Sequence, residues 1–374
     1  MNYRFDKIAF NSTVKKTPTE SDKEHYIGLE HIDSECLEIT RWGSNVAPIG
    51  EKLIMKKGDV LFGKRRAYQR KLAIAPFDGI FSAHGMVLRP NEEVVDKNYF
   101  PFFMSSDLFM ERAVQISVGG LSPTINWKDL REQEFPLPSL AEQKVLADKL
   151  WAAYRLKESY KKLLAATEEM VKSQFIEMFG SVDDNLKSYD IKKVGDFAEC
   201  FAGATPSTKI PSYWDNGNIP WMSSGEVHKG RVQDTDAKIT QQGYDGCSTK
   251  MVPIHSIVVA LAGQGKTRGT VAINEIELCT NQSLCAIVPN GEVNYEYLFH
   301  NLRGRYKELR SMSGDVDGRG GLNLKHIQSI KVIVPPMSEQ MKFVSIARQA
   351  DKSGFELRKS IEAIDAVIKS LINS

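Results

Sequence analysis

The sequence lacks the features of a membrane, secreted or disulfide-bonded protein. No apolar run reaches the length that a bilayer-spanning helix needs, and no secretory leader is visible at the start. The five cysteines form no C-x-x-C pair and no zinc-ligand spacing, so we expect neither a disulfide framework nor a metal site. These absences favour a cytoplasmic protein in a reducing compartment.

An excess of charge of one sign is lacking as well. With 49 Lys and Arg against 47 Asp and Glu, the formal net charge is only +2, so the chain as a whole carries no strong nucleic-acid signature. Hydrophobic residues make up 42% and charged residues 26%, as in ordinary globular domains. The length of 374 residues predicts two domains, and any DNA-binding surface must come from a local concentration of charge.

Catalytic signatures are missing too. The seven histidines show neither an H-E-x-x-H motif nor metal spacing, and no G-x-S-x-G motif occurs. Pro335–Pro336 lacks the preceding Asn or Asp and the following aromatic residue of an amino-methyltransferase motif. Ala260–Thr267 (ALAGQGKT) resembles a phosphate loop, but the residues after it read as strand or turn, not as the helix whose N-terminus would bind the anion. We therefore predict a binding protein, not an enzyme, and keep an NTPase that uses Lys266 as an alternative.

What the chain does contain is one segment written twice. Residues 125–143 and 322–340 align at an offset of 197 positions, and both copies hold an Asn-x-Lys triplet, then a proline, then Glu-Gln. Apolar residues coincide between these identities. A period near half the chain length is too long for a solenoid and indicates duplication of a whole domain together with its helix.

A long helix is predicted after each copy. Residues 139–180 contain no proline and no glycine until the last position, and Ser139 with Glu142 forms a capping box. Residues 338–374 form the second helix, for which Ser338 is the predicted cap. At about 1.5 Å per residue, roughly 40 residues make a rod of about 60 Å. We expect the two rods to pair antiparallel and to act as a ruler between two modules.

Both helices carry a heptad seam, with residues at alternating steps of four and three. The predicted seam positions are Leu146, Leu150, Ala153, Lys157, Tyr160, Leu164, Thr167, Val171 and Gln174 in the first helix, and Phe343, Ala347, Ala350, Gly354, Leu357, Ile361, Ile364, Ile368 and Leu371 in the second. Helices that each pack only on their own domain are the alternative, but globular helices average about 11–12 residues.

The rest of the chain divides into two similar modules, residues 1–138 and 181–337. Short apolar runs between turn residues predict strands such as 59–62 and 72–75, and one helix is expected over about 101–113. The predicted fold is α+β: two similar domains, each a mixed sheet plus helices, separated by the two long antiparallel coiled-coil helices, with a pseudo-twofold internal repeat.

Each module places a basic loop after an apolar strand. Gly63–Lys71 (GKRRAYQRK) holds five basic residues, one tyrosine and no acid, and Gly263–Arg268 (GQGKTR) stands at the matching place. Such loops can contact DNA phosphates and base edges. A charge run on one loop is often no more than solvated surface, but its recurrence in both modules favours DNA contact.

Further polar segments follow the basic loops. A polar loop recurs at 81–84 and 280–283, and glycine-rich turns recur at 118–122 and 317–321, where the glycines could equally serve only to shape a turn. The predicted DNA-binding residues are Lys64, Arg65, Arg66, Tyr68, Arg70, Lys71, His84, Ser223, Ser224, Lys266, Thr267, Arg268, Asn281 and Arg319.

Three motifs of the second module resemble a known family. Gly203–Ser207 (GATPS), Tyr213–Trp214 and Ile219–Ser224 (IPWMSS) are similar, in this order, to the opening of a target-recognition domain in the specificity subunits of Type I restriction–modification systems. Each motif alone is moderately specific. Their order, and the duplication around them, make the resemblance specific over essentially the whole chain.

The first module shares this resemblance less fully. Tyr26–Ile32 (YIGLEHI) looks like the corresponding opening, but the G-x-T-P-S and Tyr-Trp segments are absent there, so it is assigned by position. The paired P-x-x-x-E-Q starts at Pro138 and Pro335 match the two helical regions of the family. The modules are therefore expected to read different sequences.

The resemblance implies a non-catalytic specificity subunit that binds double-stranded DNA. Each domain would read one half of a bipartite, asymmetric site, and the helices would set the spacer and dock two modification (methyltransferase) subunits. Motor–nuclease restriction subunits would join this core. The chain itself would bind no cofactor, with S-adenosylmethionine, ATP and Mg expected on the partner subunits.

Other readings stay open at this point. The chain could be the specificity component of a related, non-Type-I DNA modification system, or a coiled-coil scaffold whose basic loops are incidental. No membrane partner is expected. Self-association of the isolated chain through its exposed helix faces is expected.

Overall fold

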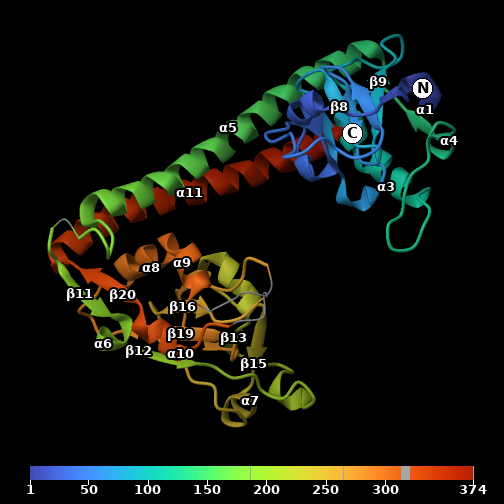
Figure 1. Cartoon of the computed structure of the whole chain (residues 1–374). Coiled ribbons are helices and arrows are strands. Elements are labelled where there is room, and N and C mark those ends of the chain that lie inside the picture. Colours follow the sequence, from blue (N-terminus) through green and yellow to red (C-terminus); the bar gives the residue numbers. More distant parts are fainter. Residues whose placement is uncertain (186, 264, 313–320, 374) are drawn as a thin grey trace. The chain divides into compact units, whose positions relative to one another are not determined.

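The computed structural model describes residues 1–185, 187–263, 265–312 and 321–373. The chain divides into two compact units, Met1–Lys162 with Leu357–Ser374, and Leu163–Glu356. Helix α5 (Leu140–Phe179) begins in the first unit and ends in the second, and helix α11 (Met337–Ile372) does the reverse. Figure 1 traces both, α5 in green and α11 in red.

The first unit contains two four-stranded sheets and a two-stranded ribbon. The first sheet has the order β2 (Ala9–Ser12), β9 (Met86–Pro90), β6 (Val60–Phe62), β7 (Leu72–Ile74), and the second β3 (Lys15–Lys16), β5 (Lys52–Met55), β8 (Gly79–Phe81), β4 (Tyr26–Ile27). The ribbon pairs β1 (Asn2–Arg4) with β10 (Glu134–Pro136). The remaining elements are α1 (Phe5–Ile8), α2 (Phe100–Ser105), α3 (Asp107–Gln115), α4 (Trp127–Leu130) and the 3₁₀ helices η1 (Glu20–His25), η2 (Leu29–His31) and η3 (Ala67–Gln69).

Strand β6 shows why this unit has layers. Val60 and Phe62 lie in one core cluster with residues of α2, α3 and the first turns of α5, whereas Leu61 lies in another with residues of the second sheet. Side chains alternate between the two faces of a strand, so a strand covered on both faces must be apolar throughout. The run Val-Leu-Phe therefore specifies a central strand between helices on one side and a second sheet on the other.

The helix expected over 101–113 is in fact two helices. Ser106 has extended backbone angles, with φ −62° and ψ 151°, and its hydroxyl accepts the backbone N–H of Phe109 at 3.1 Å. Ser106 thus caps α3, and this start signal ends α2 one residue earlier. The prediction of one continuous helix was wrong for this reason.

The second unit repeats the plan. A five-stranded sheet has the order β12 (Ala198–Ala202), β19 (Leu284–Pro289), β16 (Ile257–Ala260), β17 (Val271–Asn274), β14 (Arg231–Val232), and a three-stranded sheet β15 (Ala237–Ile239), β13 (Ile219–Met222), β18 (Cys279–Thr280). Strand β11 (Asp190–Lys193) pairs with β20 (Lys331–Val334). The remaining elements are α6 (Val194–Phe197), α7 (Gln241–Asp245), α8 (Tyr295–Gly304), α9 (Tyr306–Ser311), α10 (Leu324–Ser329), η4 (Pro211–Tyr213) and η5 (Ser224–Lys229).

The strand order β2-β9-β6-β7 of the first unit recurs as β12-β19-β16-β17 in the second, and its register recurs as well. Ala9 of β2 lies opposite Pro90 of β9, and Ala198 of β12 lies opposite Pro289 of β19. Each unit mixes parallel and antiparallel pairs: β4 with β8 is parallel in the first unit, as are β13 with β18 and β14 with β17 in the second, whereas β5 with β8 and β13 with β15 are antiparallel. The predicted α+β fold with mixed sheets and an internal repeat is confirmed.

The long helices pair through the predicted seam. Every predicted seam position is buried or partly buried. Lys157 of α5 donates to Asp365 of α11 in the first unit, and Phe175 packs edge-on against Phe343 in the second, so the helices run antiparallel. Within the part of the chain that the structure describes, neither these nor any other helix has an apolar stretch that could cross a membrane.

The two helices start differently. Ser139 and Glu142 form the predicted capping box: the N–H of Glu142 donates to the Ser139 hydroxyl at 3.3 Å, and the N–H of Ser139 donates to the Glu142 carboxylate at 2.9 Å. Ser338 is not a cap, because α11 already begins at Met337. The carbonyl of Pro336 accepts the N–H groups of Glu339 and Gln340, at 2.9 and 3.1 Å, and this starts the helix one residue before Ser338.

Candidate nucleic-acid interface

The basic loop of the first unit has a fixed backbone. It leaves β6 at Gly63, whose N–H donates to the carbonyl of Lys71 at 2.9 Å and so closes the loop. Arg66 and Arg70 flank η3, and both have left-handed angles, φ +57° and +50°. Such angles are unfavourable for a side chain with a Cβ and persist only where contacts impose them. The loop is therefore shaped by its surroundings.

Two arginines and a tyrosine of this loop are exposed to solvent. Arg65 and Arg66 are exposed, and the Tyr68 side chain is 56% exposed beside them. Lys64 is partly buried, and burial together with the neighbouring charge of Lys15 lowers its pKa. Burial is the larger cause, and an incoming phosphate would relieve the smaller one, the repulsion between Lys64 and Lys15.

The glycine-rich turn lies against the basic loop. Val118 and Thr124 exchange backbone hydrogen bonds of 3.0 and 2.9 Å, which close the turn, and Thr124 also forms a β-bridge with Arg65. Arg66 donates from its backbone to the carbonyl of Pro123 at 2.7 Å and from Nε to the Ser122 hydroxyl at 3.3 Å. Two segments predicted separately thus form one surface, which we call the first loop surface (residues 63–71 and 117–125).

Two other predicted residues of this loop have partners inside the protein. Arg70 is paired with Asp107 at 2.5 Å and with Glu35 at 3.4 Å. The Lys71 ammonium donates to the carbonyl of Leu29 at 2.6 Å. His84, from the polar loop, is exposed and donates its N–H to the Ser82 hydroxyl at 3.3 Å. Their DNA contacts stay predictions.

The second unit has the matching hydrogen bond just before its basic loop. The N–H of Leu322 donates to the carbonyl of Leu261 at 2.9 Å, as Ile125 donates to Lys64 at 2.9 Å in the first unit. Lys266 is exposed, and its carbonyl accepts the Tyr306 hydroxyl at 3.3 Å. Arg319 and most of the second glycine turn lie outside the described residues.

The remaining residues of this loop are less accessible. Thr267 is partly buried, and its hydroxyl lies 3.2 Å from Nε2 of His228. The Arg268 side chain is only 3% exposed. After Thr267 the chain turns directly into β17, so the helix that a phosphate loop requires does not follow. The NTPase alternative loses its structural basis here.

The polar residues after β13 and β18 meet because these strands are parallel neighbours. Asn281 donates its N–H to the carbonyl of Met222 at 3.1 Å, which places it next to Ser223. Ser223 donates from its backbone and hydroxyl to the Glu226 carboxylate, at 2.8 and 3.1 Å, and Ser224 follows it, partly exposed. We call residues 223–228, 265–268 and 281–283 the second loop surface.

The G-A-T-P-S motif is built into the same corner. A Cβ at Gly203 would overlap the carbonyl oxygen of Thr280, so only glycine fits there. Thr205 donates to the Gln282 side chain at 2.6 Å. The indole N–H groups of Trp221 and Trp214 hold the motif at its two ends by donating to the carbonyls of Ala204 and Ser207, at 3.1 and 3.2 Å.

Sequence reasoning missed the residues that support these surfaces. His228, Tyr306 and Ser122 are polar side chains beside the loops, yet none belongs to a repeated basic run. Only Ser122 had a signal in the sequence, because it closes the glycine-rich turn. The others come from segments 39 and 40 residues away from their partners, Thr267 and Lys266.

A cluster with metal-ligand chemistry lies elsewhere in the second unit. Among the described residues, Glu296, His300 and Asp351 form a group whose ligand atoms lie within 4.8 Å of one another. Nη2 of Arg231 sits 2.6 Å from a carboxylate oxygen of both Glu296 and Asp351. The guanidinium already supplies the positive charge that this pair of carboxylates needs, so the cluster reads as a buried ion network.

Two related α+β modules, each with a basic loop after a central strand (β6 or β16), define a class of protein with a duplicated domain and paired long helices. The chain belongs to the family described as the Type I restriction modification DNA specificity domain, whose model matches residues 11–169 and 187–364. The repeat predicted from the sequence is thus also a repeat of the family's domain.

Relatives and solved structures agree with this family. The putative Type I restriction enzyme MjaX specificity subunit of Methanocaldococcus jannaschii is 24% identical over 377 residues, covering 92% of this chain and 84% of that protein. The EcoR124I/EcoR124II specificity subunit of Escherichia coli is 25% identical over 162 residues, 43% of this chain, and this match spans only 40% of the E. coli protein. The match to the MjaIX specificity subunit of M. jannaschii likewise spans 44% of that relative.

The crystal structure of a Type I restriction–modification S subunit from M. genitalium has the same fold. It superposes with a TM-score of 0.61 at 15% identity and covers 100% of this chain and 94% of its own. A second structure, from a study of assembly and conformational transition of the Type I R-M system, gives a TM-score of 0.57 at 17% identity.

Proposed function

We propose that this chain is the sequence-specificity subunit of a Type I restriction–modification complex, in which each unit reads one half of a bipartite, asymmetric DNA site. The observation that carries the proposal is a backbone hydrogen bond that recurs at the matching place in the two units. Ile125 donates to Lys64 just after β6, and Leu322 donates to Leu261 just after β16, so that in both units the start of the repeated segment is joined to the chain that enters or forms the basic loop. A duplicated device of this kind suits two related but different half-sites.

The exposed cations support phosphate contact, and the polar residues around them support readout. Arg65 and Arg66 in the first loop surface and Lys266 in the second are exposed. Tyr68, Ser224 and Asn281 lie beside them with hydroxyl or amide groups that can reach base edges. Because the two surfaces carry different residues, they should prefer different sequences.

We assign the chemistry to partners. In this proposal the chain is non-catalytic and binds no cofactor, and S-adenosylmethionine belongs to two modification (methyltransferase) subunits docked on the long helices. ATP and Mg belong to motor–nuclease subunits that join the complex in the cytoplasm. The paired helices α5 and α11 fix the unread spacer between the two half-sites.

Site selection from a random DNA pool tests the proposal, with the chain co-expressed with a Type I modification subunit encoded beside it. Two short motifs at one fixed separation are expected. A single contiguous motif would show that only one unit reads DNA. No enriched motif would contradict the proposal and favour the coiled-coil scaffold.

Paired variants then assign each half-site to a unit. Arg65→Ala with Arg66→Ala should weaken selection of one half only, and Lys266→Ala should weaken the other. Lys7→Ala with Lys97→Ala removes two exposed cations outside both loop surfaces and is the matched control. Uniform weakening of every sequence by both loop variants would make these residues phosphate anchors without a part in readout.

A further inference from the structure

We propose that Arg70 is a positioning residue that joins the first loop surface to the last turn of α11, so that recognition of the first half-site depends on the C-terminal end of the chain. The inference rests on the proposed function, since it takes DNA contact by this loop as given. Arg70 had been predicted to touch DNA, and its observed partners assign it another task.

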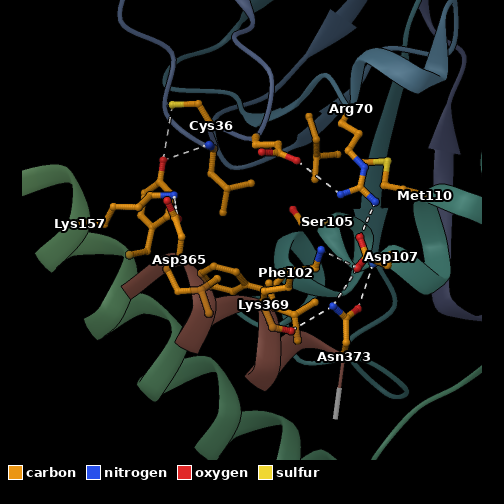
Figure 2. Close-up of a pocket in the computed structure, with 16 residues that line it drawn as sticks. Cys36, Arg70, Phe102, Ser105, Asp107, Met110, Lys157, Asp365, Lys369 and Asn373 are labelled. Atoms are coloured by element: carbon orange, nitrogen blue, oxygen red, sulfur yellow. Dashed lines mark hydrogen bonds and ion pairs between the residues drawn. The ribbon is translucent and has the colours of Figure 1, made fainter. Parts of the chain in front are cut away.

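A continuous set of polar contacts leads from the loop to the helix end, as Figure 2 shows. Nη2 of Arg70 lies 2.5 Å from Oδ1 of Asp107. The N–H of Asp107 donates to Oδ1 of Asn373 at 3.0 Å, and the Asn373 amide donates back to Oδ2 of Asp107 at 3.2 Å. The ammonium of Lys369 stands 3.4 Å from the same Oδ2. Asp107 is thus shared between the loop and α11.

Asp107 is well placed to hold these partners. It is the first residue of α3, where a carboxylate is stabilised by the helix dipole. The hydrogen bond from Arg70, followed by its charge and that of Lys369, keeps the pKa of Asp107 below its ordinary value. The carboxylate is therefore ionised at neutral pH and available to both cations.

The backbone of Arg70 explains why the loop would respond to this contact. Arg70 adopts a left-handed conformation that an arginine disfavours, and its N–H donates to the carbonyl of Ala67 at 2.8 Å. Four residues earlier Arg66, with the same handedness, touches Ser122 of the glycine-rich turn. If the guanidinium loses Asp107, the strained end of η3 loses a restraint, and Arg65 and Arg66 lose their fixed direction.

Open space borders this network. A cavity of about 270 Å³ lies beside this network, and Arg70, Asp107, Lys369 and Asn373 all line it. Close-packed interiors transmit strain and resist movement, whereas side chains at a cavity of this size have room to move. At this corner the polar contacts of Asp107 link the Arg70 side chain to α11, while Ala67 of the same loop packs in the core beneath it.

The direction in which Asp107→Asn changes the DNA affinity distinguishes a positioning role of Arg70 from direct contact with DNA. If Arg70 contacted phosphate, Asp107→Asn would release it and tighten DNA binding, with a steeper dependence of affinity on salt. If Arg70 positions the loop, Asp107→Asn and Arg70→Gln both weaken binding to the first half-site, by on the order of tenfold. Neither should lower the affinity for the second half-site.

The experiment measures affinity for duplexes that keep both half-sites or carry a scrambled first or second half, using the assembled complex. Asn373→Ala, which is remote from the basic loop in sequence and exposed, should weaken the first half in the same way. In a double-mutant cycle, Arg70→Gln combined with Asp107→Asn should be no worse than either alone. Arg70→Lys, which keeps the ion pair, should restore part of the affinity.

The outcomes distinguish this inference from the proposed function. A wild-type complex that shows no preference for the bipartite site over scrambled duplexes would overturn the proposed function itself. A wild-type complex that reads both halves, together with an Asp107→Asn variant that binds more tightly, would overturn only the role of Arg70. Additive effects in the cycle, or equal loss at both half-sites, would also overturn it, because a general loss of stability affects both.

Discussion

The buried side chains of Gln143 and Gln340 make the same hydrogen bonds in the two units. Oε1 of Gln143 accepts the N–H of Asp96 at 2.8 Å, and Oε1 of Gln340 accepts the N–H of Asn294 at 2.8 Å. Each Nε2 donates at 2.9 Å to the carbonyl of the proline five residues earlier. The glutamine of the repeated Glu-Gln pair is therefore a structural residue that fastens the start of each long helix to its own module.

Replacing Gln143 should destabilise the first unit. Gln143→Leu fills the space but leaves the Asp96 N–H and the Pro138 carbonyl buried without partners, so the free energy of unfolding should fall by about 2–4 kcal/mol. Urea unfolding measures the change. Lys144→Ala, at the next and exposed position, should change it by less than about 0.5 kcal/mol. Equal effects of both variants would contradict the role assigned to the amide.

Much of the architecture could be predicted from local patterns. The apolar runs at β6 and β7, the capping box of α5 and the heptad seams each depend on residues close in sequence. The exceptions are instructive. Ser338 looked like a cap until Pro336 proved to accept the first N–H groups, and Ser106 divided a helix that periodicity alone had joined.

The candidate site could be predicted only as a set of separate loops. Which loops meet depends on strand pairing between distant segments: Arg66 reaches Ser122 across 56 positions, and Asp107 reaches Asn373 across 266. Whether a cation of the loop is exposed or paired with a carboxylate also depends on which distant segments meet. Arg65 and Arg70 belong to one basic run, yet one is exposed and the other is held by a carboxylate that no local pattern reveals.

For the seam contact between Lys157 and Asp365, we predict that removing the lysine and removing the aspartate change the stability of the first unit in different directions. The Lys157 side chain is 9% exposed and that of Asp365 is 52% exposed, with Nζ and Oδ1 2.8 Å apart. Lys157→Met removes a nearly buried charge and keeps the apolar stem, so the stability of the first unit should stay the same or rise by about 1 kcal/mol. Asp365→Ala strands the buried ammonium and should lower stability by about 1 kcal/mol.

Thermal unfolding of the two single variants and the double variant checks this contrast. Adding Asp365→Ala to Lys157→Met should cost almost nothing, because the ammonium that needed the carboxylate is gone. A destabilising Lys157→Met that is equal in size to Asp365→Ala would instead show that the ion pair contributes more than an apolar contact at this seam position.

His300 makes the stability of the second unit depend on pH. Burial lowers its pKa to about 4, against about 6.5 for a histidine in an unfolded chain. Between these values the unfolded chain binds a proton that the folded unit does not. Stability should therefore be full above about pH 6.5 and decrease as the pH falls toward 4, by on the order of 1.4 kcal/mol per pH unit.

Unfolding measured at pH 7, 6 and 5 tests this dependence in the second unit. His300→Phe should flatten the pH profile, because it removes the titrating imidazole. It keeps the aromatic contact with Phe343, whose ring centroid lies 5.6 Å from that of His300. His84→Gln, a change at an exposed histidine of the first unit, controls for the loss of a histidine elsewhere. An unchanged slope in His300→Phe would assign the pH dependence to other groups.

Leu121 is the most exposed large apolar side chain of the first loop surface. It is 98% exposed at the tip of the glycine-rich turn, and the next residue, Ser122, is bonded to Arg66. An apolar side chain at this place can contact a thymine methyl group or wedge against a base step. We predict that Leu121→Ser weakens binding to the first half-site by about 1 kcal/mol.

Salt dependence distinguishes this contact from those of its charged neighbours. Leu121→Ser releases no counterion, so the slope of log affinity against log salt should match that of the wild type. Arg65→Ala with Arg66→Ala should instead reduce the slope by about 0.9 for each phosphate that the variant no longer neutralises. Ile49→Ser, at a 95% exposed position in another loop of the same unit, should leave both affinity and slope unchanged.

If Leu121→Ser behaved like Ile49→Ser, the turn would only shape the loop. A lowered slope in Leu121→Ser would mean that the turn positions the arginines, because a misdirected cation no longer displaces counterions from the DNA.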